Sequence, residues 1–201
     1  MIRAGIALAT LLWLAGIGWG FTTLARHEMT PGAKATAGAD WPAGTSLARS
    51  PGGPTLVLFA HPRCPCMKAT LEELDRLVAR TGGAARVSVH FFSPRGADWS
   101  DTDVTRRAAC IPGVSVLADP DGVEARRFGA LTSGDAFLYD AGGRLVFRGG
   151  ITPSRGHQGE SAGRSAIEAF LKGGRPRTAT APVFGCPIRS QHGAQLEERG
   201  S

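Results

Sequence analysis

Cysteine is scarce in this sequence, which has four cysteines among its 201 residues. That density is too low for a small domain held together by disulfides, so the disulfide-rich secreted scaffolds are excluded. The sequence also lacks a second C-x-C or C-x-x-C pair, which a four-coordinate zinc site would normally use. No internal repeat is present. The length and these absences together favour one ordinary globular domain with accessory segments.

The sequence also lacks a run of basic residues with interleaved aromatic residues. The net charge is +6 and the pI is about 9.8, but the basic residues are mostly arginines scattered along the chain. Nucleic-acid-binding proteins concentrate such charge on one face or helix. We therefore expect no nucleic-acid partner, and we interpret the charge as a solvated basic surface. The 42% content of hydrophobic residues is typical of a globular chain.

Ionisable side chains are absent from residues 4–25, which are predominantly apolar. About 20 such residues suffice to cross a bilayer as a helix, so residues 1–26 are predicted to form a membrane anchor. A cleaved signal peptide is the alternative, but the small-residue sites near Ala35 lie well beyond the apolar run. The short amino end with Arg3 is expected to stay in the cytoplasm, which places the rest of the chain on the extracytoplasmic, periplasmic side.

Two segments flank the main body of the chain. Residues 27–53 are rich in proline and small residues and are predicted to form a flexible linker, with Trp41 docking onto the domain. Residues 174–201 form a C-terminal tail that becomes apolar at PVFGCPI. Beyond Arg189 the tail is expected to be disordered.

Residues 54–173 alternate between short apolar runs and amphipathic segments. Predicted strands cover 54–60, 86–92, 114–119, 136–140 and 144–148, and predicted helices cover 67–81, 100–109, 123–128 and 162–172. The last two strands form a hairpin with a glycine-containing turn, and Ser100 or Asp101 and Ser161 are the expected helix caps. This order predicts an α/β domain with a mixed sheet and helices on both faces.

Cys64 and Cys66 fall where the first strand of this domain gives way to a helix. A thiolate at a helix N-terminus faces unpaired N–H groups and the positive end of the helix dipole, which favours the reactive form. Arg63 adds positive charge, and His61 offers a proton carrier. A C-x-C disulfide closes a small strained ring that is easily reduced, which suits an exchanging pair better than a structural one.

Two other interpretations of this pair stay open. The thiols can be inert neighbours, or Cys64, Cys66 and His61 can form a soft site for copper or zinc. Zinc would normally require a fourth ligand.

These residues also carry a resemblance to a known family. The run LVLFAHPRCPCMKATLEEL resembles the strand, active-site turn and helix of the thioredoxin superfamily, and the later half resembles membrane-anchored proteins of the TlpA/ResA type. HPRCPC, FGALTSG, GGITPSRGHQGESAGR and VFGCP together resemble the thioredoxin-like proteins labelled RedB, over residues 54–188. These four motifs are much more specific jointly than singly.

The resemblance implies a thioredoxin-like fold in which Cys64 is the nucleophile and the loop at Ser133 and Gly134 faces the cysteine pair. It also implies a protein thiol or disulfide as the partner and no cofactor. Two departures from the superfamily pattern stand out. Met67 occupies the place of the second cysteine of a C-x-x-C motif, and Gly134 occupies the place of the cis-proline.

A glycine-rich segment after the hairpin is the second unusual feature. It contains Arg155, His157 and Arg164 just before a helix, so an anion-binding or proton-transfer site is one interpretation. The other is a loop that caps the edge of the sheet.

Three further residues with reactive side chains lie outside these motifs. Cys110 and His90 are expected to be packed structural residues. Cys186, in VFGCPI, is a candidate to return to the active turn and resolve a mixed disulfide with Cys64 or Cys66.

The sequence thus favours a membrane-anchored, extracytoplasmic thiol–disulfide oxidoreductase. Cys64 attacks the partner, Cys66 resolves the mixed disulfide, and His61 and Arg63 tune the thiolate. A metal-binding module and a catalytically degenerate structural or sensing module are the alternatives.

Overall fold

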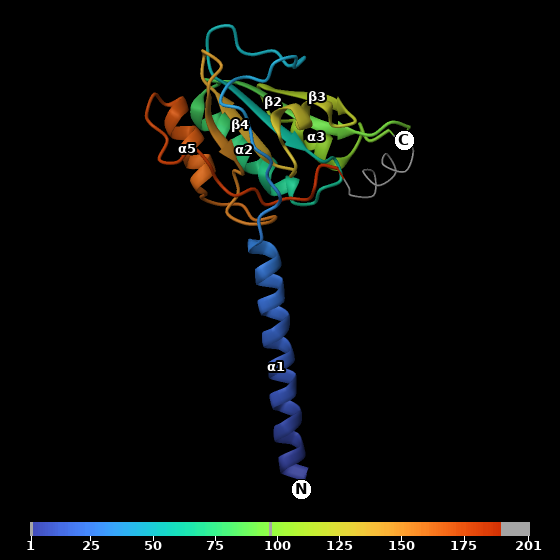
Figure 1. Cartoon of the computed structure of the whole chain (residues 1–201). Coiled ribbons are helices and arrows are strands. Elements are labelled where there is room, and N and C mark those ends of the chain that lie inside the picture. Colours follow the sequence, from blue (N-terminus) through green and yellow to red (C-terminus); the bar gives the residue numbers. More distant parts are fainter. Residues whose placement is uncertain (1, 97, 190–201) are drawn as a thin grey trace.

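The computed structural model describes residues 2–96 and 98–189 (Figure 1). The first element, α1 (Ile2–Met29), extends away from the rest of the molecule as a single straight helix. Its segment Gly5–Met29 is long and apolar enough to cross a membrane, and none of that window is buried against the protein. A signal sequence meets the same criteria. The expected single apolar N-terminal helix is therefore present.

The domain is built on one five-stranded sheet in the order β3-β2-β1-β4-β5. The strands are β1 (Thr55–Ala60), β2 (Arg86–Ser93), β3 (Val114–Pro120), β4 (Asp135–Tyr139) and β5 (Leu145–Gly149). β1, β2 and β3 pair in parallel, whereas β4 is antiparallel to both β1 and β5. The sheet is mixed, as predicted.

The central strand β1 is buried on both faces because every residue in it is apolar or small. Leu56, Leu58 and Ala60 point into one core, and Val57 and Phe59 point into the other.

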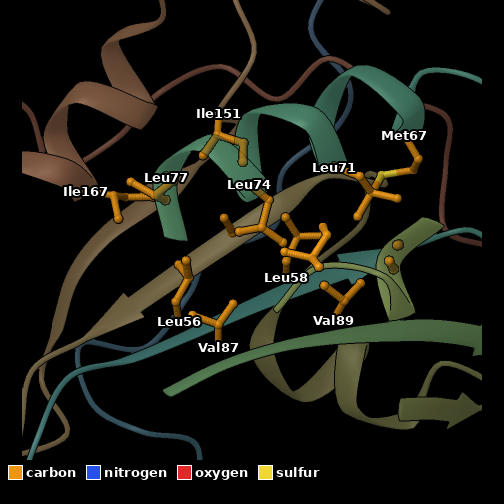
Figure 2. Packing of buried hydrophobic residues seen from close by; sticks show 14 of the residues in the cluster. Leu56, Leu58, Met67, Leu71, Leu74, Leu77, Val87, Val89, Ile151 and Ile167 are labelled. Carbon is orange, nitrogen blue, oxygen red and sulfur yellow. The ribbon is translucent and has the colours of Figure 1, made fainter. Parts of the chain in front are cut away.

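The first of these cores is covered by α2 (Met67–Thr81), α3 (Asp103–Ala109) and α5 (Ala162–Leu171). Figure 2 shows Leu71, Leu74 and Leu77 of α2 directed onto the strands. The predicted Ser161 cap is confirmed, since its side chain accepts a hydrogen bond from the Arg164 N–H.

The opposite face is covered by α4 (Val123–Phe128) and by the chain that follows α1. Trp41 packs edge-on against Phe128 and Tyr139, with ring centroids 5.3 and 4.9 Å apart. Its docking is confirmed. Helices on both faces are therefore confirmed as well.

The segment predicted as a flexible linker over 27–53 differs from that expectation in two ways. Helix α1 continues through Met29, and the residues after it lie along the domain. The Leu145 N–H donates to the Ala39 carbonyl, and the Trp41 N–H donates to the Gly143 carbonyl. Both bonds join this segment to the β4–β5 hairpin. The hydrophobic docking of Trp41 supplies contacts that a composition-based linker prediction does not include.

Two local expectations were wrong. The third helix begins at Asp103, because Thr102 rather than Ser100 or Asp101 is its N-cap and forms a reciprocal capping box with Thr105. Cys110 is exposed instead of packed, and it forms the C-cap of α3.

The described part of the tail packs into the domain. The backbone of Arg148 forms two hydrogen bonds with the tail. Its N–H donates to the Ala179 carbonyl, and its carbonyl accepts from the Ala181 N–H. Gly149 permits this approach, because a Cβ atom there would collide with the Ala181 carbonyl. Val183 is fully buried. The expected disorder beyond Arg189 concerns residues outside the described part of the chain.

Candidate functional site

The Cys64-Pro65-Cys66 turn connects the carboxyl end of β1 to the first turn of α2. The Cys64 N–H donates to the His61 carbonyl at 3.0 Å, and the Met67 N–H donates to the Cys64 carbonyl at 3.1 Å. These bonds fold the turn tightly before the helix starts at Met67. Both thiols are enclosed, with exposed fractions of 1% for Cys64 and 8% for Cys66.

A third cysteine reaches this turn from the tail. The Ser133 N–H donates to the Cys186 carbonyl at 2.8 Å, and the Ile188 N–H donates to the Leu131 carbonyl at 2.9 Å. The tail therefore runs antiparallel to the loop before β4. Gly185 is needed at this crossing, because a Cβ atom there would collide with the Ser133 backbone.

The three sulfur atoms of Cys64, Cys66 and Cys186 lie within 4.8 Å of one another. Among the described residues they form the only such group of potential metal ligands, and His61 is not part of it. The sequence-based alternative set of Cys64, Cys66 and His61 is therefore not assembled. Cys186 stands in the place given to the histidine.

The loop at Ser133 and Gly134 borders the same turn. The Ser133 hydroxyl accepts a hydrogen bond from the His61 N–H at 2.9 Å, and the Gly134 N–H donates to the Phe59 carbonyl at 2.8 Å. A Cβ atom at Gly134 would lie 3.9 Å from the Met67 sulfur. The loop is thus hydrogen-bonded to the chain at the end of β1, just before the cysteine turn.

His61 and Arg63 contact each other and Trp99 beside the cysteine turn. The His61 Nδ1 atom accepts a hydrogen bond from the Arg63 N–H, and its ring lies 5.3 Å from that of Trp99. Burial, followed by the charge of Arg63, lowers the pKa of His61. The Arg63 guanidinium stacks 4.4 Å over the Trp99 ring. Trp99 thus engages both residues that the sequence assigned to thiolate tuning.

The three residues of the predicted anion or proton site do not converge. His157 is exposed, and its ring nitrogen Nδ1 lies 2.9 Å from the Arg155 carbonyl oxygen. Arg164 is buried and pairs with the fully buried Glu73 at 3.1 Å. Glu73 also accepts a hydrogen bond from the Gly159 N–H at 2.9 Å. Arg164 therefore joins α5 to α2, and Glu73 of α2 also holds the glycine-rich loop at Gly159.

Arg155 instead turns toward the thiols. Its guanidinium donates to the Gly185 carbonyl at 2.6 Å and interacts with the Cys66 thiol. Its backbone N–H donates to the Glu28 carbonyl at the end of α1, at 3.0 Å. One arginine thus joins the tail, the thiol site and the N-terminal helix.

A cavity of about 520 Å³ opens beside the thiols. Its walls include His27, Pro65, Cys66, Leu131, Arg155 and Cys186. A cavity of this size accommodates an extended peptide segment or a small molecule.

Comparisons with known proteins find solved structures that are similar to this chain. No family model matches the chain, and a search of curated proteins also finds no match. A hypothetical protein of Sinorhizobium meliloti is 28% identical, with a TM-score of 0.57, over 80% of this chain and 94% of that chain. An uncharacterised conserved protein of Geobacillus kaustophilus is 22% identical, with a TM-score of 0.53, over 81% of this chain and 93% of that one.

A third solved structure carries a functional description. It is a secreted Mycobacterium tuberculosis disulfide oxidoreductase homologous to E. coli DsbE, 19% identical, with a TM-score of 0.40, over 61% of this chain and 82% of that chain. The sheet order and the cysteine turn between β1 and α2 are those of a thioredoxin-like fold.

Within this thioredoxin-like site the pKa values of Cys66 and Cys186 are both raised. Burial raises the pKa of Cys186 to about 12, and its hydrogen bond to Cys64 and the charges of Cys64 and Cys66 act in the same direction. Burial, then Cys64, also raises the pKa of Cys66, while Arg155 opposes the rise. Both thiols therefore stay protonated near pH 7.

Sequence reasoning missed the contribution of α1 and of Trp99 to this thioredoxin-like site. His27 lines the cavity and Trp99 covers His61. No local pattern marks either residue, because both reach the site through contacts that are remote along the chain.

Proposed function

We propose that this protein is a thiol–disulfide oxidoreductase that exchanges disulfides with a protein partner. The observation that carries the proposal is the cluster of Cys64, Cys66 and Cys186 at the start of α2, with all sulfurs within 4.8 Å. Thiols at this separation can pair after a small side-chain movement, since a disulfide bond is about 2.05 Å long. The thioredoxin-like fold supports the same chemistry.

The reaction begins at Cys64. Cys64 lies in the turn that leads into α2, and its sulfur is within 4.8 Å of the sulfurs of Cys66 and Cys186. It attacks one sulfur of the partner disulfide, forming a mixed disulfide and releasing the other sulfur as a thiol. A second thiol, from Cys66 or Cys186, then loses its proton to the departing partner sulfur as it attacks the Cys64 sulfur, and the partner leaves with two thiols. The protein retains the two-electron oxidation as its own disulfide.

The neighbouring residues have separate roles in this proposal. Arg155 opposes the rise in the pKa of Cys66 that burial causes, and so favours Cys66 as the resolving thiol. His61, whose pKa is lowered, stays neutral near pH 7 and can accept the proton released during exchange. Arg63 acts through backbone and ring contacts with His61 and Trp99.

The location is part of the same proposal. Helix α1 remains attached as a single membrane span, and the domain lies on the extracytoplasmic side. The apolar length of Gly5–Met29 and the absence of burial along it support the anchor. Protein disulfides form and persist mainly in extracytoplasmic compartments, so a thiol–disulfide oxidoreductase would find its substrates there.

A turnover assay tests the proposal. The full chain in lipid nanodiscs receives a cyclic disulfide peptide and a chemical reductant, and peptide reduction is followed by mass spectrometry. We expect Cys64→Ser to abolish reduction, whereas Cys110→Ser, which changes an exposed cysteine outside the site, leaves it unchanged. The double variant Cys66→Ser/Cys186→Ser should accumulate the mixed disulfide at Cys64. Equal rates for the wild type and Cys64→Ser would refute the mechanism.

Soft-metal binding is a second candidate function, favoured by the same three sulfurs. A metal–sulfur bond of about 2.3 Å places three thiolates about 4 Å apart around a shared ion. The observed group needs only slight contraction to reach that geometry. Three thiolates suit Cu(I) better than zinc, which prefers four ligands. Titration with Cu(I) against a chromophoric chelator would show one bound ion per chain, lost in Cys186→Ser, if this function is real.

A further inference from the structure

The thiol cavity lies at the end of the domain where α1 arrives. His27, Gly32 and Ala33, from the end of that helix and the chain just after it, line the same cavity as Cys66 and Cys186. Figure 1 shows α1 meeting the domain at this end only. The helix therefore contributes part of the wall of the redox site.

Several hydrogen bonds fix this junction. The Arg155 N–H donates to the Glu28 carbonyl at 3.0 Å, and its guanidinium donates to the Thr30 carbonyl at 3.2 Å. The Gly32 N–H donates to the Val183 carbonyl at 2.8 Å, two residues before Gly185 of the tail. The bond to Glu28 satisfies a carbonyl at the C-terminus of α1 that lacks a partner within the helix. The domain is therefore held directly on the helix end.

The height of the cavity above a bilayer follows from the helix geometry. The run without ionisable side chains ends at Ala25, and His27 lies two residues further along α1. At about 1.5 Å per residue, His27 lies about 3 Å beyond the apolar run. The headgroup layer on each side of a bilayer is roughly 5–8 Å thick. A membrane-inserted α1 thus places the cavity in the headgroup layer.

The cavity rim suits that environment. Leu131 is 41% exposed, and Pro65 and Pro187 are exposed beside the thiols. Apolar side chains at this depth can contact lipid or another membrane-spanning segment.

We propose that the partner of this site is a membrane protein whose reactive cysteines lie within the first few residues outside its own membrane span. This inference rests on the proposed oxidoreductase function and on an attached α1. A partner cysteine at the headgroup level meets Cys64 and Cys66 without either protein leaving the bilayer. The exchange reduces the partner disulfide to two thiols as the site cysteines form a disulfide, and the reverse direction oxidises the partner.

The test uses full-length protein in proteoliposomes with synthetic single-span peptides. One peptide carries a Cys-x-x-Cys disulfide about three residues outside its span, and a matched peptide carries it about 20 residues outside. Both peptides have the same surface concentration, so their rates of reduction compare position alone. We expect the near peptide to react at least about tenfold faster. Equal rates, or a faster far peptide, would overturn the inference and point to a soluble partner.

A lengthened variant provides the control. A polar helical insert of eleven residues between Ala25 and Arg26 raises the domain by about 16 Å and keeps the contacts of Arg155 with Glu28 and Thr30. This variant should lose the preference for the near peptide and keep its rate with a soluble cyclic disulfide peptide. A retained near preference contradicts the inference. Failure of the wild type with every peptide, the soluble one included, would instead refute the oxidoreductase function.

Discussion

Replacing Arg164 with methionine removes the cation of a buried ion pair and leaves its partner in place. The Arg164 guanidinium lies 3.1 Å from the Glu73 carboxylate, and the two side chains are 6% and 0% exposed. Removing one partner of a buried pair costs about 3–5 kcal/mol, because the remaining charge stays desolvated. Glu73 keeps Arg76 at 2.6 Å and the Gly159 N–H, which places the loss near the lower end, at about 3 kcal/mol.

Thermal unfolding of the full chain in detergent, followed by near-UV circular dichroism, measures this loss. A protein of this size changes its melting temperature by about 2–4 °C per kcal/mol, so Arg164→Met should melt about 6–12 °C below the wild type. The double variant Glu73→Gln/Arg164→Met should recover most of the difference, because neither charge remains. Arg107→Met is the matched control, since its pair with Glu72 is exposed and should contribute under about 1 kcal/mol. A loss for Arg164→Met no larger than the control would refute the reasoning.

Three further predictions concern other parts of the molecule. Burial lowers the pKa of His90 from 6.5 to about 4, so the unfolded state binds a proton that the folded state excludes. The free energy of unfolding should therefore fall by about 3 kcal/mol as the pH drops from 6.5 toward 4. Urea unfolding of His90→Gln should show a smaller loss over this range, and an unchanged loss would contradict the prediction. Alkylation of the reduced protein near pH 8, followed by mass spectrometry, should modify the exposed Cys110 at least about tenfold faster than Cys186, whose pKa is about 12. Faster labelling of Cys186 would show that the tail does not hold it at the site. Trp41→Ala should cost about 2–3 kcal/mol in urea unfolding through its lost ring contacts, whereas an unaltered midpoint would show that the chain after α1 is not docked.

The parts of the fold that local chemistry specifies could be predicted from the sequence. The apolar run at β1, the helical spacing of leucines in α2 and the Ser161 cap depend on residues close together in the chain. The cysteine turn belongs to the same class, because a strand end and a helix start define its place.

The parts that depend on remote contacts could not be predicted. Trp41 docks through an aromatic cluster that forms only once the sheet exists. Arg155 and Arg164 stand in one glycine-rich segment, yet one reaches Cys66 and the other Glu73. The sequence allowed the hypothesis that Cys186 reaches Cys64 and Cys66, but it could not establish it. The contact depends on where the tail crosses the Ser133 loop at Gly185, which the tertiary fold determines.

A redox titration of the full chain in glutathione buffers tests the central claim most directly, with each thiol quantified by alkylation and mass spectrometry. The account predicts one reversible two-electron couple that involves Cys64, has a potential between about −270 and −120 mV, and disappears in Cys64→Ser. Cys110 should take no part in it. Cys64, Cys66 and Cys186 that stay reduced across the whole range, or that become reactive only after a chelator is added, would contradict the account and favour metal binding.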